Sequence, residues 1–400
     1  MVKRFGELIE AYRRRAQWRQ QDLAEAAQVH RSAISRTENP PEDSPDYPPL
    51  AVARTIMGAL HRQHPFQWGE LQELATAYLI PPALRDEQGQ SKVIGVSVPS
   101  GARSAIWSCM VGAIEEEARQ RGYMIVLCQH DEEIDQQLEH LDFFADLPGL
   151  AGLILAPAVG ITEPPRWQRY GLYDALEPLR KRQVPIVFID RKVPARVPVP
   201  YVGLDNVAAA KRAVEHLIKA GHRRIGALLA LPHASTQQER HDGYRRALDR
   251  IGAYDETLVR WGEEVPRANR EKDRARYGIR RGLRNATELL SLPEGQRPTA
   301  IFCATYYMAL EALKAMQTLD PSGTRLSVPK QLALIGFDDV PELDIPTPQI
   351  SRLEYPVSDL AKRAVAKIET LIANPQDSRA LQDALIKTFY IAEKGSVGGA

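Results

Sequence analysis

Four polar side chains close to the N-terminus have the chemistry that proteins use to read DNA. They are Arg31, Ser32, Ser35 and Arg36. An arginine can bond a guanine edge through two donors, and a serine can bond a base or a phosphate. Residues 1–40 hold eight Lys or Arg and five Asp or Glu, whereas the net charge of the whole chain is only +1. Basic character confined to one segment favours a DNA contact there over general binding of polyanions.

Two short helical patterns position these side chains. Leu23, Ala24 and Ala27 fall at helical spacing. A break at residues 28–30 is followed by a second helical pattern that includes Ile34. The gap is long enough only for a sharp turn, so the spacing predicts a helix-turn-helix with the four polar residues on the outer face of its second helix. The same spacing also fits an ordinary helical hairpin.

This segment resembles the lambda-repressor/Cro-type helix-turn-helix family. The matching residues are Gln20, Leu23-Ala24, Val29, Ile34-Ser35 and Glu38. The resemblance covers about residues 4–80 and implies a five-helix unit. It implies DNA contacts by Gln20, His30, Arg31, Ser32, Ser35 and Arg36. After Glu38 the run NPPEDSPDYPP makes the connection to the fourth helix longer than is usual in that family.

From residue 92 onward, short runs of Val, Ile and Leu alternate with helical patterns. Strands are expected at 93–98, 123–128, 152–156, 185–190, 201–203, 224–229, 300–303 and 332–337. Helices are expected at 104–121, 134–145, 173–182, 206–220, 239–251, 274–290 and 308–319. Nearly continuous apolar strands predict parallel sheets covered by helices on both faces, and two rounds of alternation predict two Rossmann-like lobes. A ligand site is then expected at the carboxyl ends of the strands, in the crevice between the lobes.

Motifs of common enzyme classes are missing from this region. The stretch 98–101 after the first strand has one glycine where a dinucleotide fold needs three, and no GxxxxGK[ST], GxSxG or HExxH occurs. Cys109, Cys128 and Cys303 lie far apart without a CxxC pair, which argues against disulfides and a zinc cluster. We therefore expect no catalytic residue, no cofactor and no bound metal.

The same region resembles the effector-binding domain of the lactose-repressor/galactose-repressor family, itself similar to periplasmic sugar-binding proteins. The resemblance covers Lys92 to about Val397, with motifs that include VPIVFIDR, YVGLDN, ERHDGYRRAL and LALIGFDDVP. It implies that Asp190, Arg240 and Asp338 bind the ligand. Carboxylates accept hydrogen bonds from hydroxyl groups, and arginine offers a fork of donors to sugar oxygens. In the plainer alternative the two aspartates cap turns and the arginine forms a surface ion pair.

Two departures from the family concern the ligand. Thr305 and Tyr306 stand where the family usually has Asn-Asp, so an amide contact is replaced by a bulky aromatic ring and the effector is expected to differ from a familiar hexose. Trp107 and Trp261 could stack on a sugar face or belong to the core. The basic stretch 265–281 could be a solvated helix or could contact an acidic effector. Thr305, Tyr306 and Trp107 are therefore further candidates for binding the effector.

The predicted fold is an all-α helix-turn-helix head followed by an α/β two-lobed periplasmic-binding-protein-like domain. The head is expected at 1–80, a linker without the family's hinge helix at 81–91, and the sensor at 92–397. Within the sensor, lobe 1 is expected at 92–203 and 356–375, and lobe 2 at 204–353 and 380–397. Three hinge crossovers are expected, near 202–203, 338–340 and 354–356.

The predicted function is sequence-specific transcriptional regulation, interpreted as repression, in response to a sugar or sugar derivative. The expected partners are a palindromic double-stranded DNA operator, the small-molecule effector and a second copy of the chain in a homodimer. No signal-peptide pattern and no apolar run of about 18 residues occurs, which predicts a cytoplasmic protein without a membrane partner. The alternatives are a small-molecule-binding protein without a gene-regulatory role and an α/β enzyme.

Overall fold

A computed structural model describes residues 5–39, 50–63, 65–66, 70, 74, 92–100, 105–147, 149–159, 171–191, 199–262, 279–323, 326–338, 345 and 349–398. The chain divides into two compact units. One contains residues 1–95, 119–126 and 146–152, and the other contains residues 96–118, 127–145 and 153–400.

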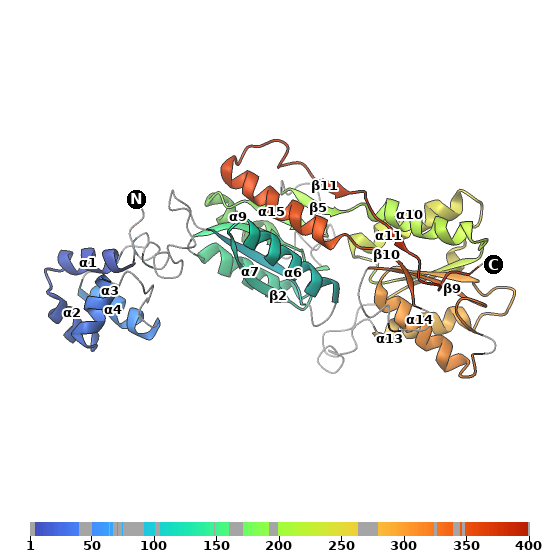
Figure 1. Cartoon of the computed structure of the whole chain (residues 1–400), viewed down its shortest axis with the longest axis horizontal. Helices are drawn as coiled ribbons and strands as arrows, with labels where there is room; N and C mark the ends of the chain where they lie inside the picture. Colours follow the sequence, from blue (N-terminus) through green and yellow to red (C-terminus); the bar gives the residue numbers. More distant parts are fainter. Residues whose placement is uncertain are drawn as a thin grey trace. The chain divides into compact units, whose positions relative to one another are not determined.

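The described part of the head contains four helices. They are α1 (Phe5–Arg15), α2 (Gln20–Ala27), α3 (Arg31–Glu38) and α4 (Leu50–Gln63), drawn in blue in Figure 1. Gln28 adopts the left-handed conformation (φ 55°), and the N–H of Val29 bonds the carbonyl of Ala24 at 2.9 Å, which ends α2. His30 then caps α3 by accepting a bond from the N–H of Ser32 at 3.2 Å. The predicted helix-turn-helix is therefore present.

The apolar positions of the helical patterns build the core of the head. Its fully buried members include Phe5, Leu8, Ile9, Leu23, Ile34, Ile56 and Leu60. The five-helix unit implied by the resemblance is described only through α4, because most of residues 67–80 and the whole predicted linker at 81–91 lie outside the described residues.

The first α/β sheet has six strands in the order β11-β5-β4-β3-β1-β2. They are β1 (Val93–Pro99), β2 (Met124–His130), β3 (Leu150–Leu155), β4 (Ile186–Ile189), β5 (Tyr201–Leu204) and β11 (Ala384–Ile386). The helices of this lobe are α6 (Ala105–Gln120), α7 (Ile134–Asp146), α9 (Leu172–Lys181) and α15 (Val357–Ala373). Strands β3, β4, β5 and β11 pair in parallel, and α15 packs on β4 and β5.

The second sheet also has six strands, in the order β12-β10-β9-β8-β6-β7. They are β6 (Ile225–Leu229), β7 (Val259–Trp261), β8 (Ala300–Cys303), β9 (Ala333–Phe337), β10 (Ser351–Leu353) and β12 (Ile391–Ala392), of which β12 pairs antiparallel with β10. The helices are α10 (Asn206–Lys219), α11 (Ser235–Asp249), α13 (Ile279–Leu290) and α14 (Tyr306–Leu319). Figure 1 shows α10 and α11 on one face of this sheet and α13 and α14 on the other. The predicted two-lobed α/β architecture is confirmed.

The chain passes between the two sheets three times, as predicted, but one crossing is elsewhere. It leaves the first sheet after β5 and returns to it between β10 and α15, close to two of the predicted points. The third crossing lies between β11 and β12, not near 338–340, because β9 and β10 are neighbours in the second sheet. Residues 384–386 therefore belong to the first sheet, where β11 pairs with β5, and not to lobe 2 as expected.

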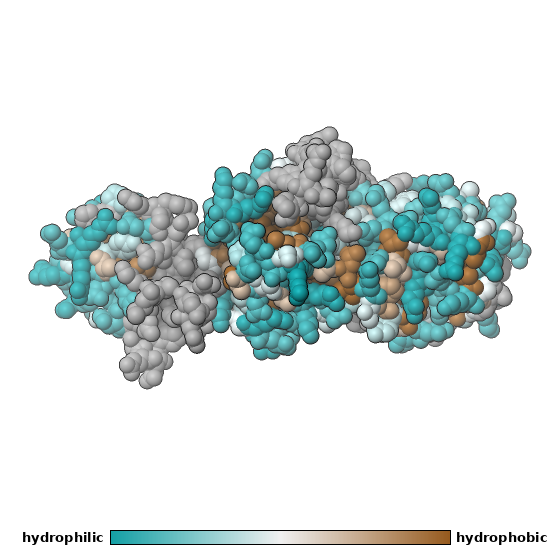
Figure 2. Space-filling model, turned by 90° about the horizontal axis from the view of Figure 1, so that it is seen from above, coloured by the Kyte–Doolittle hydropathy of each residue, from teal (hydrophilic) through white to brown (hydrophobic). Residues whose placement is uncertain are grey.

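Short strands account for most of the elements missed from the sequence. β7, β10, β11 and β12 have two or three residues each, too few to show a period. No described helix is long and apolar enough to cross a membrane. Figure 2 shows hydrophilic residues over most of the visible face of the described chain, with hydrophobic residues gathered in small patches.

Candidate effector site and DNA-binding face

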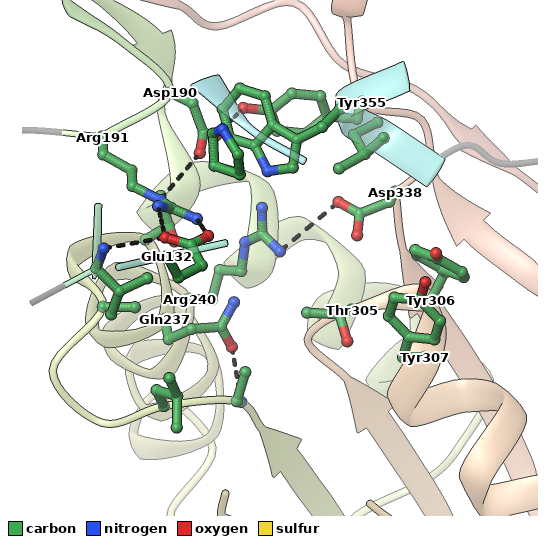
Figure 3. Close-up of a pocket in the computed structure, with 18 of the residues that line it drawn as sticks. Glu132, Asp190, Arg191, Gln237, Arg240, Thr305, Tyr306, Tyr307, Asp338 and Tyr355 are labelled. Atoms are coloured by element: carbon green, nitrogen blue, oxygen red, sulfur yellow. Dashed lines mark hydrogen bonds and ion pairs between the residues drawn. The ribbon is translucent and has the colours of Figure 1, made fainter. Parts of the chain in front are cut away.

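A cavity of about 220 Å³ lies within the larger unit, and both sheets contribute to its walls (Figure 3). All six residues predicted to bind the effector line this cavity: Trp107, Asp190, Arg240, Thr305, Tyr306 and Asp338. Asp190, Thr305 and Asp338 follow the carboxyl ends of β4, β8 and β9. Parallel strands present their carboxyl ends at one edge of a sheet, and that edge carries the cavity.

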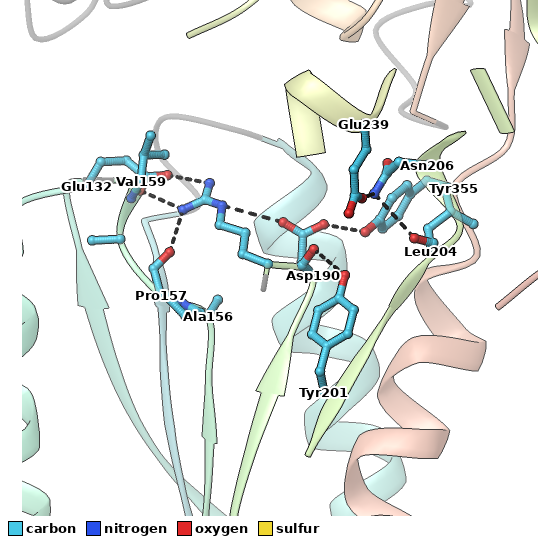
Figure 4. A network of polar contacts seen from close by, with 12 residues as sticks. Glu132, Ala156, Pro157, Val159, Asp190, Tyr201, Leu204, Asn206, Glu239 and Tyr355 are labelled. Carbon is cyan, nitrogen blue, oxygen red and sulfur yellow. Dashed lines mark hydrogen bonds and ion pairs between the residues drawn. The ribbon is translucent and has the colours of Figure 1, made fainter. Parts of the chain in front are cut away.

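Asp190 occupies a strained position that its neighbours hold in place. Its φ of 68° lies in the left-handed region, which aspartate adopts at a cost. The hydroxyl of Tyr355 donates to Oδ1 of Asp190, and the hydroxyl of Tyr201 donates to its backbone carbonyl at 2.8 Å. Burial raises the pKa of both tyrosines well above the ordinary value, so both stay protonated donors. The carboxylate of Asp190 thus lies between Tyr355 and Arg191 (Figure 4), and Asp190 lines the cavity.

Gly203 explains how Tyr201 reaches Asp190. The ring of Tyr201 passes directly over this glycine, and a Cβ there would lie 1.7 Å from the tyrosine hydroxyl. The glycine in YVGLDN therefore serves the site and not a turn.

Arg240 is buried, not a surface ion-pair partner. Its Nε donates to Oδ1 of Asn206 at 3.0 Å and its Nη1 donates to the carbonyl of Ala304 at 2.5 Å. Its guanidinium lies 3.7 Å from the centre of the Phe337 ring, and Nη1 is 3.7 Å from Oδ1 of Asp338. The fork is therefore fixed in direction, with the carboxylate of Asp338 beside it.

The pattern Arg-x-x-Gly-Tyr has a physical basis in the crossing of α10 and α11. A Cβ on Gly243 would meet the carbonyl of Val207 at 2.3 Å, so only glycine allows the two helices to come this close. Tyr244, one helical turn after Arg240, donates to the carbonyl of Ile225 at 2.6 Å. These contacts fix the face of α11 that carries Arg240.

Asp338 is buried and strained, with φ 79°. Burial raises the pKa of its carboxyl group, and the charge of Arg240 opposes this rise. Burial disfavours the charged carboxylate, and a backbone hydrogen bond from Tyr306 offsets part of this cost together with Arg240.

The sequence-based prediction missed an ion pair that lines the same cavity. Both Nη atoms of Arg191 donate to the carboxylate of Glu132 at 2.7 Å, and Nη1 also donates to the carbonyl of Pro157 at 2.9 Å. Oε2 of Glu132 accepts from the N–H of Val159 at 3.1 Å. Although burial raises the pKa of Glu132, the charge and hydrogen bonds of Arg191 outweigh it, so the pKa lies below its ordinary value. The pair joins the ends of β2, β3 and β4 (Figure 4).

His130, at the end of β2, is fully buried beside this pair. Its Nδ1 accepts from the N–H of Glu132 at 3.3 Å, and its Nε2 lies 3.2 Å from the carbonyl of Ala156. The amide nitrogen of Gln137 also lies 3.1 Å from Nε2, so both ring nitrogens have polar neighbours. Burial lowers the pKa of His130 to about 4, so the ring is uncharged near neutral pH.

The two residues that depart from the family have distinct positions. Thr305 caps α14, because its hydroxyl accepts from the N–H of Met308 at 3.3 Å. The buried Tyr306 extends to the start of α6, where its hydroxyl accepts from the N–H of Ala105 at 3.0 Å. Tyr306 thus links a helix of the second sheet to a helix of the first.

Of the two candidate tryptophans, only Trp107 lines the cavity. It is 5% exposed, and the guanidinium of Arg191 lies 5.6 Å from its ring. Trp261 makes an edge contact with His241 at 5.2 Å and is not part of the cavity wall. The basic stretch 265–278 lies outside the described residues.

Most of the predicted DNA-contact residues have exposed side chains, but Gln20 is hydrogen-bonded within the head. His30, Arg31, Ser32 and Arg36 are exposed along α3, and Ser35 is half-buried. Gln20, at the start of α2, donates to Oε2 of Glu38 at 2.8 Å. Its amide is therefore held in one direction rather than free.

Arg13, in the last turn of α1, is engaged inside the head. Its Nε and Nη2 donate to the carboxylate of Glu38 at 2.5 and 2.8 Å, and its Nη1 donates to the carbonyl of Trp18 at 2.7 Å. The side chain of Glu38 is 1% exposed. The arginine therefore fastens α1 to α3 and is not available to phosphates.

Within the described part of the chain, no group of three or more His, Cys, Asp or Glu side chains could hold a metal ion. A helix-turn-helix head joined to a two-sheet α/β domain, with a cavity that combines charged and apolar side chains, is the architecture of a ligand-responsive transcriptional regulator.

Comparison with known proteins gives the same two types of domain. Residues 4–46 match a helix-turn-helix domain, and residues 214–396 match a periplasmic binding protein-like domain. The chain is 28% identical over 283 residues to the transcriptional regulator MalR of Streptomyces coelicolor, covering 70% of this chain and 74% of MalR. It is 26% identical over 292 residues to the transcriptional repressor CytR of Escherichia coli, covering 72% of this chain and 75% of CytR.

A solved relative has the same fold. The complex of the transcriptional regulator CelR with cellobiose superposes with a TM-score of 0.62 at 20% identity, covering 94% of this chain and 99% of CelR. The chain is thus a helix-turn-helix transcriptional regulator with a periplasmic-binding-protein-like effector domain, and its homologues are regulators of the LacI family.

Proposed function

We propose that the chain is a repressor that binds a palindromic operator as a homodimer and senses a neutral sugar or sugar derivative in the cavity. The observation that carries the effector class is the convergence of Asp190, Asp338 and Arg240 on one cavity. Carboxylates accept from sugar hydroxyls, and a fixed arginine fork donates to ring or hydroxyl oxygens.

The rest of the cavity wall fits the same ligand class. Ile106, Trp107, Tyr306 and Tyr307 give it apolar faces beside these charged groups. A sugar ring has apolar C–H faces and polar edges, so it matches a wall of this kind. CelR, which shares the fold, was solved with cellobiose.

A thermal-shift screen of the full chain tests the effector class. We expect a sugar from a panel of mono- and disaccharides to raise the melting temperature, and Arg240→Ala to abolish the rise. Arg246→Ala is the matched control, because Arg246 lies on the same helix with its side chain 62% exposed. A panel in which only anionic or non-hydroxylated compounds stabilise the protein would contradict a neutral sugar effector.

Dimerisation supports operator selectivity in this proposal. One head makes few base contacts, and two heads read two half-sites related by symmetry. Two exposed apolar side chains of the first lobe support contact with a second copy: Leu127 of the edge strand β2, which is 39% exposed, and Phe143 of α7, which is 47% exposed. Sedimentation equilibrium should give a dimer that Phe143→Lys weakens. A monomer that binds palindromic DNA with full affinity would remove this part of the proposal.

The remaining parts of the proposal are a cytoplasmic location, where operator DNA is accessible, and the lack of catalytic turnover. Incubation of a bound sugar with the protein should return it chemically unchanged. Operator binding distinguishes the regulator from a small-molecule-binding protein that lacks a gene-regulatory role.

A further inference from the structure

The side chain of Tyr306 reaches from one lobe to the other. Tyr306 begins α14 beside the second sheet, and it is 2% exposed. Its hydroxyl accepts from the N–H of Ala105, the first residue of α6 beside the first sheet, at 3.0 Å. The first N–H groups of a helix have no partner within the helix. The hydroxyl of the second lobe therefore supplies an acceptor to a backbone donor of the first.

Apolar packing accompanies this hydrogen bond. Ala105 lies against the hydrophobic cluster of the second lobe, whose buried members include Met308, Ala309 and Leu334. The start of α6 is thus docked on the second lobe by one polar contact and one apolar contact. Both contacts are exchanged for contacts with water when the two lobes separate.

Both partners of the bond are connected directly to the cavity. Three residues in the first turns of α6 line it: Ile106, Trp107 and Met110. On the other side of the bond, the backbone N–H of Tyr306 bonds the carboxylate of Asp338, and both residues lie at the cavity (Figure 3). The bond therefore joins the apolar wall that α6 contributes to a polar group of the second sheet.

The bond lies away from the hinge. The chain crosses between the sheets at the edges that contain β5 and β11 in the first sheet and β10 and β12 in the second. Helix α6 follows β1, which is three strands from β5, or about 14 Å at a strand spacing of about 4.8 Å. Rotation of the lobes by about 15° around that edge would move the N–H of Ala105 roughly 4 Å from its acceptor, which breaks the bond.

We propose that Tyr306 is a positioning residue that closes the cavity: its hydroxyl holds α6 on the second lobe in the closed form and slows the release of a bound effector. A ligand in contact with both lobes leaves only after they separate, so an interaction made only in the closed form slows its release. One hydrogen bond of this kind corresponds to about a 3- to 10-fold change. The effect on release rests on the proposed sugar effector, whereas the bond itself does not.

Hydrogen exchange of the full chain without added sugar tests the bond. Exchange is resolved to single amides in the wild type and in Tyr306→Phe, which keeps the ring but lacks the hydroxyl. The amide of Ala105 should exchange about 3- to 10-fold faster in the variant, while the amides of α14 keep their protection. A role of Tyr306 confined to packing of the second lobe would lower protection in α14 and leave Ala105 unchanged, and that result would overturn the inference.

Release kinetics test the consequence for the effector. D-glucose, D-galactose, D-xylose, D-ribose, cellobiose and maltose are first titrated by calorimetry, and the sugar that binds most tightly is used. Its release rate, followed by tryptophan fluorescence after dilution, should be about 3- to 10-fold higher in Tyr306→Phe. Tyr390→Phe is the matched control, because Tyr390 is 65% exposed, and it should release the sugar at the wild-type rate. Equal release rates in the wild type and Tyr306→Phe would overturn the role of the bond.

A double variant separates the bond from folding. Ala105→Pro/Tyr306→Phe removes the donor and the acceptor together, so no N–H is left unpaired, and proline suits the first position of a helix. This variant should release the sugar as fast as Tyr306→Phe does, and it replaces the single variant if that is unstable. Release at the wild-type rate would again overturn the inference. Failure of all six sugars to bind the wild type would overturn the proposed sugar effector alone, and the exchange of the Ala105 amide would still decide whether the bond exists.

Discussion

Three residues that line the cavity have a backbone conformation that residues other than glycine rarely adopt. Glu132, Asp190 and Asp338 have φ values of 63°, 68° and 79°. Such positions persist only where surrounding contacts hold them, and they concentrate at ligand sites. Each of the three follows the carboxyl end of a strand, at the edge of a sheet that borders the cavity. The strain is consistent with carboxylates that are placed before the ligand arrives.

At the residue scale, His130 makes the stability of the α/β unit depend on pH. Its pKa is lowered by burial from 6.5 to about 4, so the unfolded chain takes up a proton below pH 6.5 while the folded chain does not until about pH 4. The stability contributed by the neutral ring is therefore lost as the pH falls from 6.5 to about 4. Between pH 6.5 and 5, the wild type should lose about 1.5 kcal/mol more of its free energy of unfolding than His130→Gln.

Urea unfolding at the two pH values measures this difference. The charged groups facing His130, Glu132 and Arg191, keep their charges in both proteins, and His140 is common to both. His216→Gln on α10 is the control. Equal slopes for the wild type and His130→Gln would show that the ring is not held neutral.

Arg31 is the residue through which we expect base choice to be made. It is exposed in the first turn of α3. Arg31→Ala should weaken operator binding by about 1–3 kcal/mol and relax the preference for one base pair, as loss of a two-donor contact does. Gel-shift titration against an operator and its single-base variants measures both effects. An equal loss on every sequence would instead identify a phosphate contact.

At the scale of elements, the head depends on one buried ion pair between α1 and α3. Glu38 receives bonds from Arg13 and from Gln20, and removal of one partner leaves a buried charge unpaired. Glu38→Ala should destabilise the head by about 3 kcal/mol. Hydrogen exchange of α1 and α3 in the full chain measures this. The control is Glu25→Ala, which removes an exposed carboxylate on α2, and equal protection in the two variants would exclude a structural role for Glu38.

The sequence predicted most long elements well and short elements poorly, but it missed α15, a helix of 17 residues. The break at 28–30 located the turn between α2 and α3 to the residue, because the apolar spacing on both sides is regular. Strands β10, β11 and β12 have too few residues for a pattern, so the third crossing was placed wrongly. The start of α11 was predicted four residues late, at 239 instead of Ser235, because its first turn is polar.

For the site, residue type and motif order were enough to select six residues that line the cavity, while their partners were not predictable. Arg191 directly follows Asp190 in the chain, yet its partner Glu132 is separated from it by 59 positions. No local pattern reports such a pairing. The pairing of Arg13 with Glu38 is hidden for the same reason, since the two residues lie 25 positions apart.

At the scale of the whole molecule, regulation requires that a change in the sensor reach the heads. The predicted route is the linker at 81–91, which differs from the family in lacking a hinge-helix pattern. We expect saturating effector to change operator affinity by about 1–3 kcal/mol or less. Insertion of a flexible Gly-Ser segment at Gly89 should reduce this coupling, because the spacing of the heads is then no longer set by the sensor. Coupling that survives a long insertion would leave dimer assembly as the switched step.

The three crossings between the sheets also have a consequence for synthesis of the protein. The first sheet is built from β1 to β5 and then from β11, which follows about 180 residues later in the chain. A ribosome that has translated this lobe's first five strands must complete the whole second sheet except β12 before α15 and β11 exist. The edge of β5 that pairs with β11 therefore stays unpaired until almost the entire chain has been made. Truncation near the C-terminus would leave both lobes unfinished, and a nascent chain is most vulnerable to misassembly in that interval.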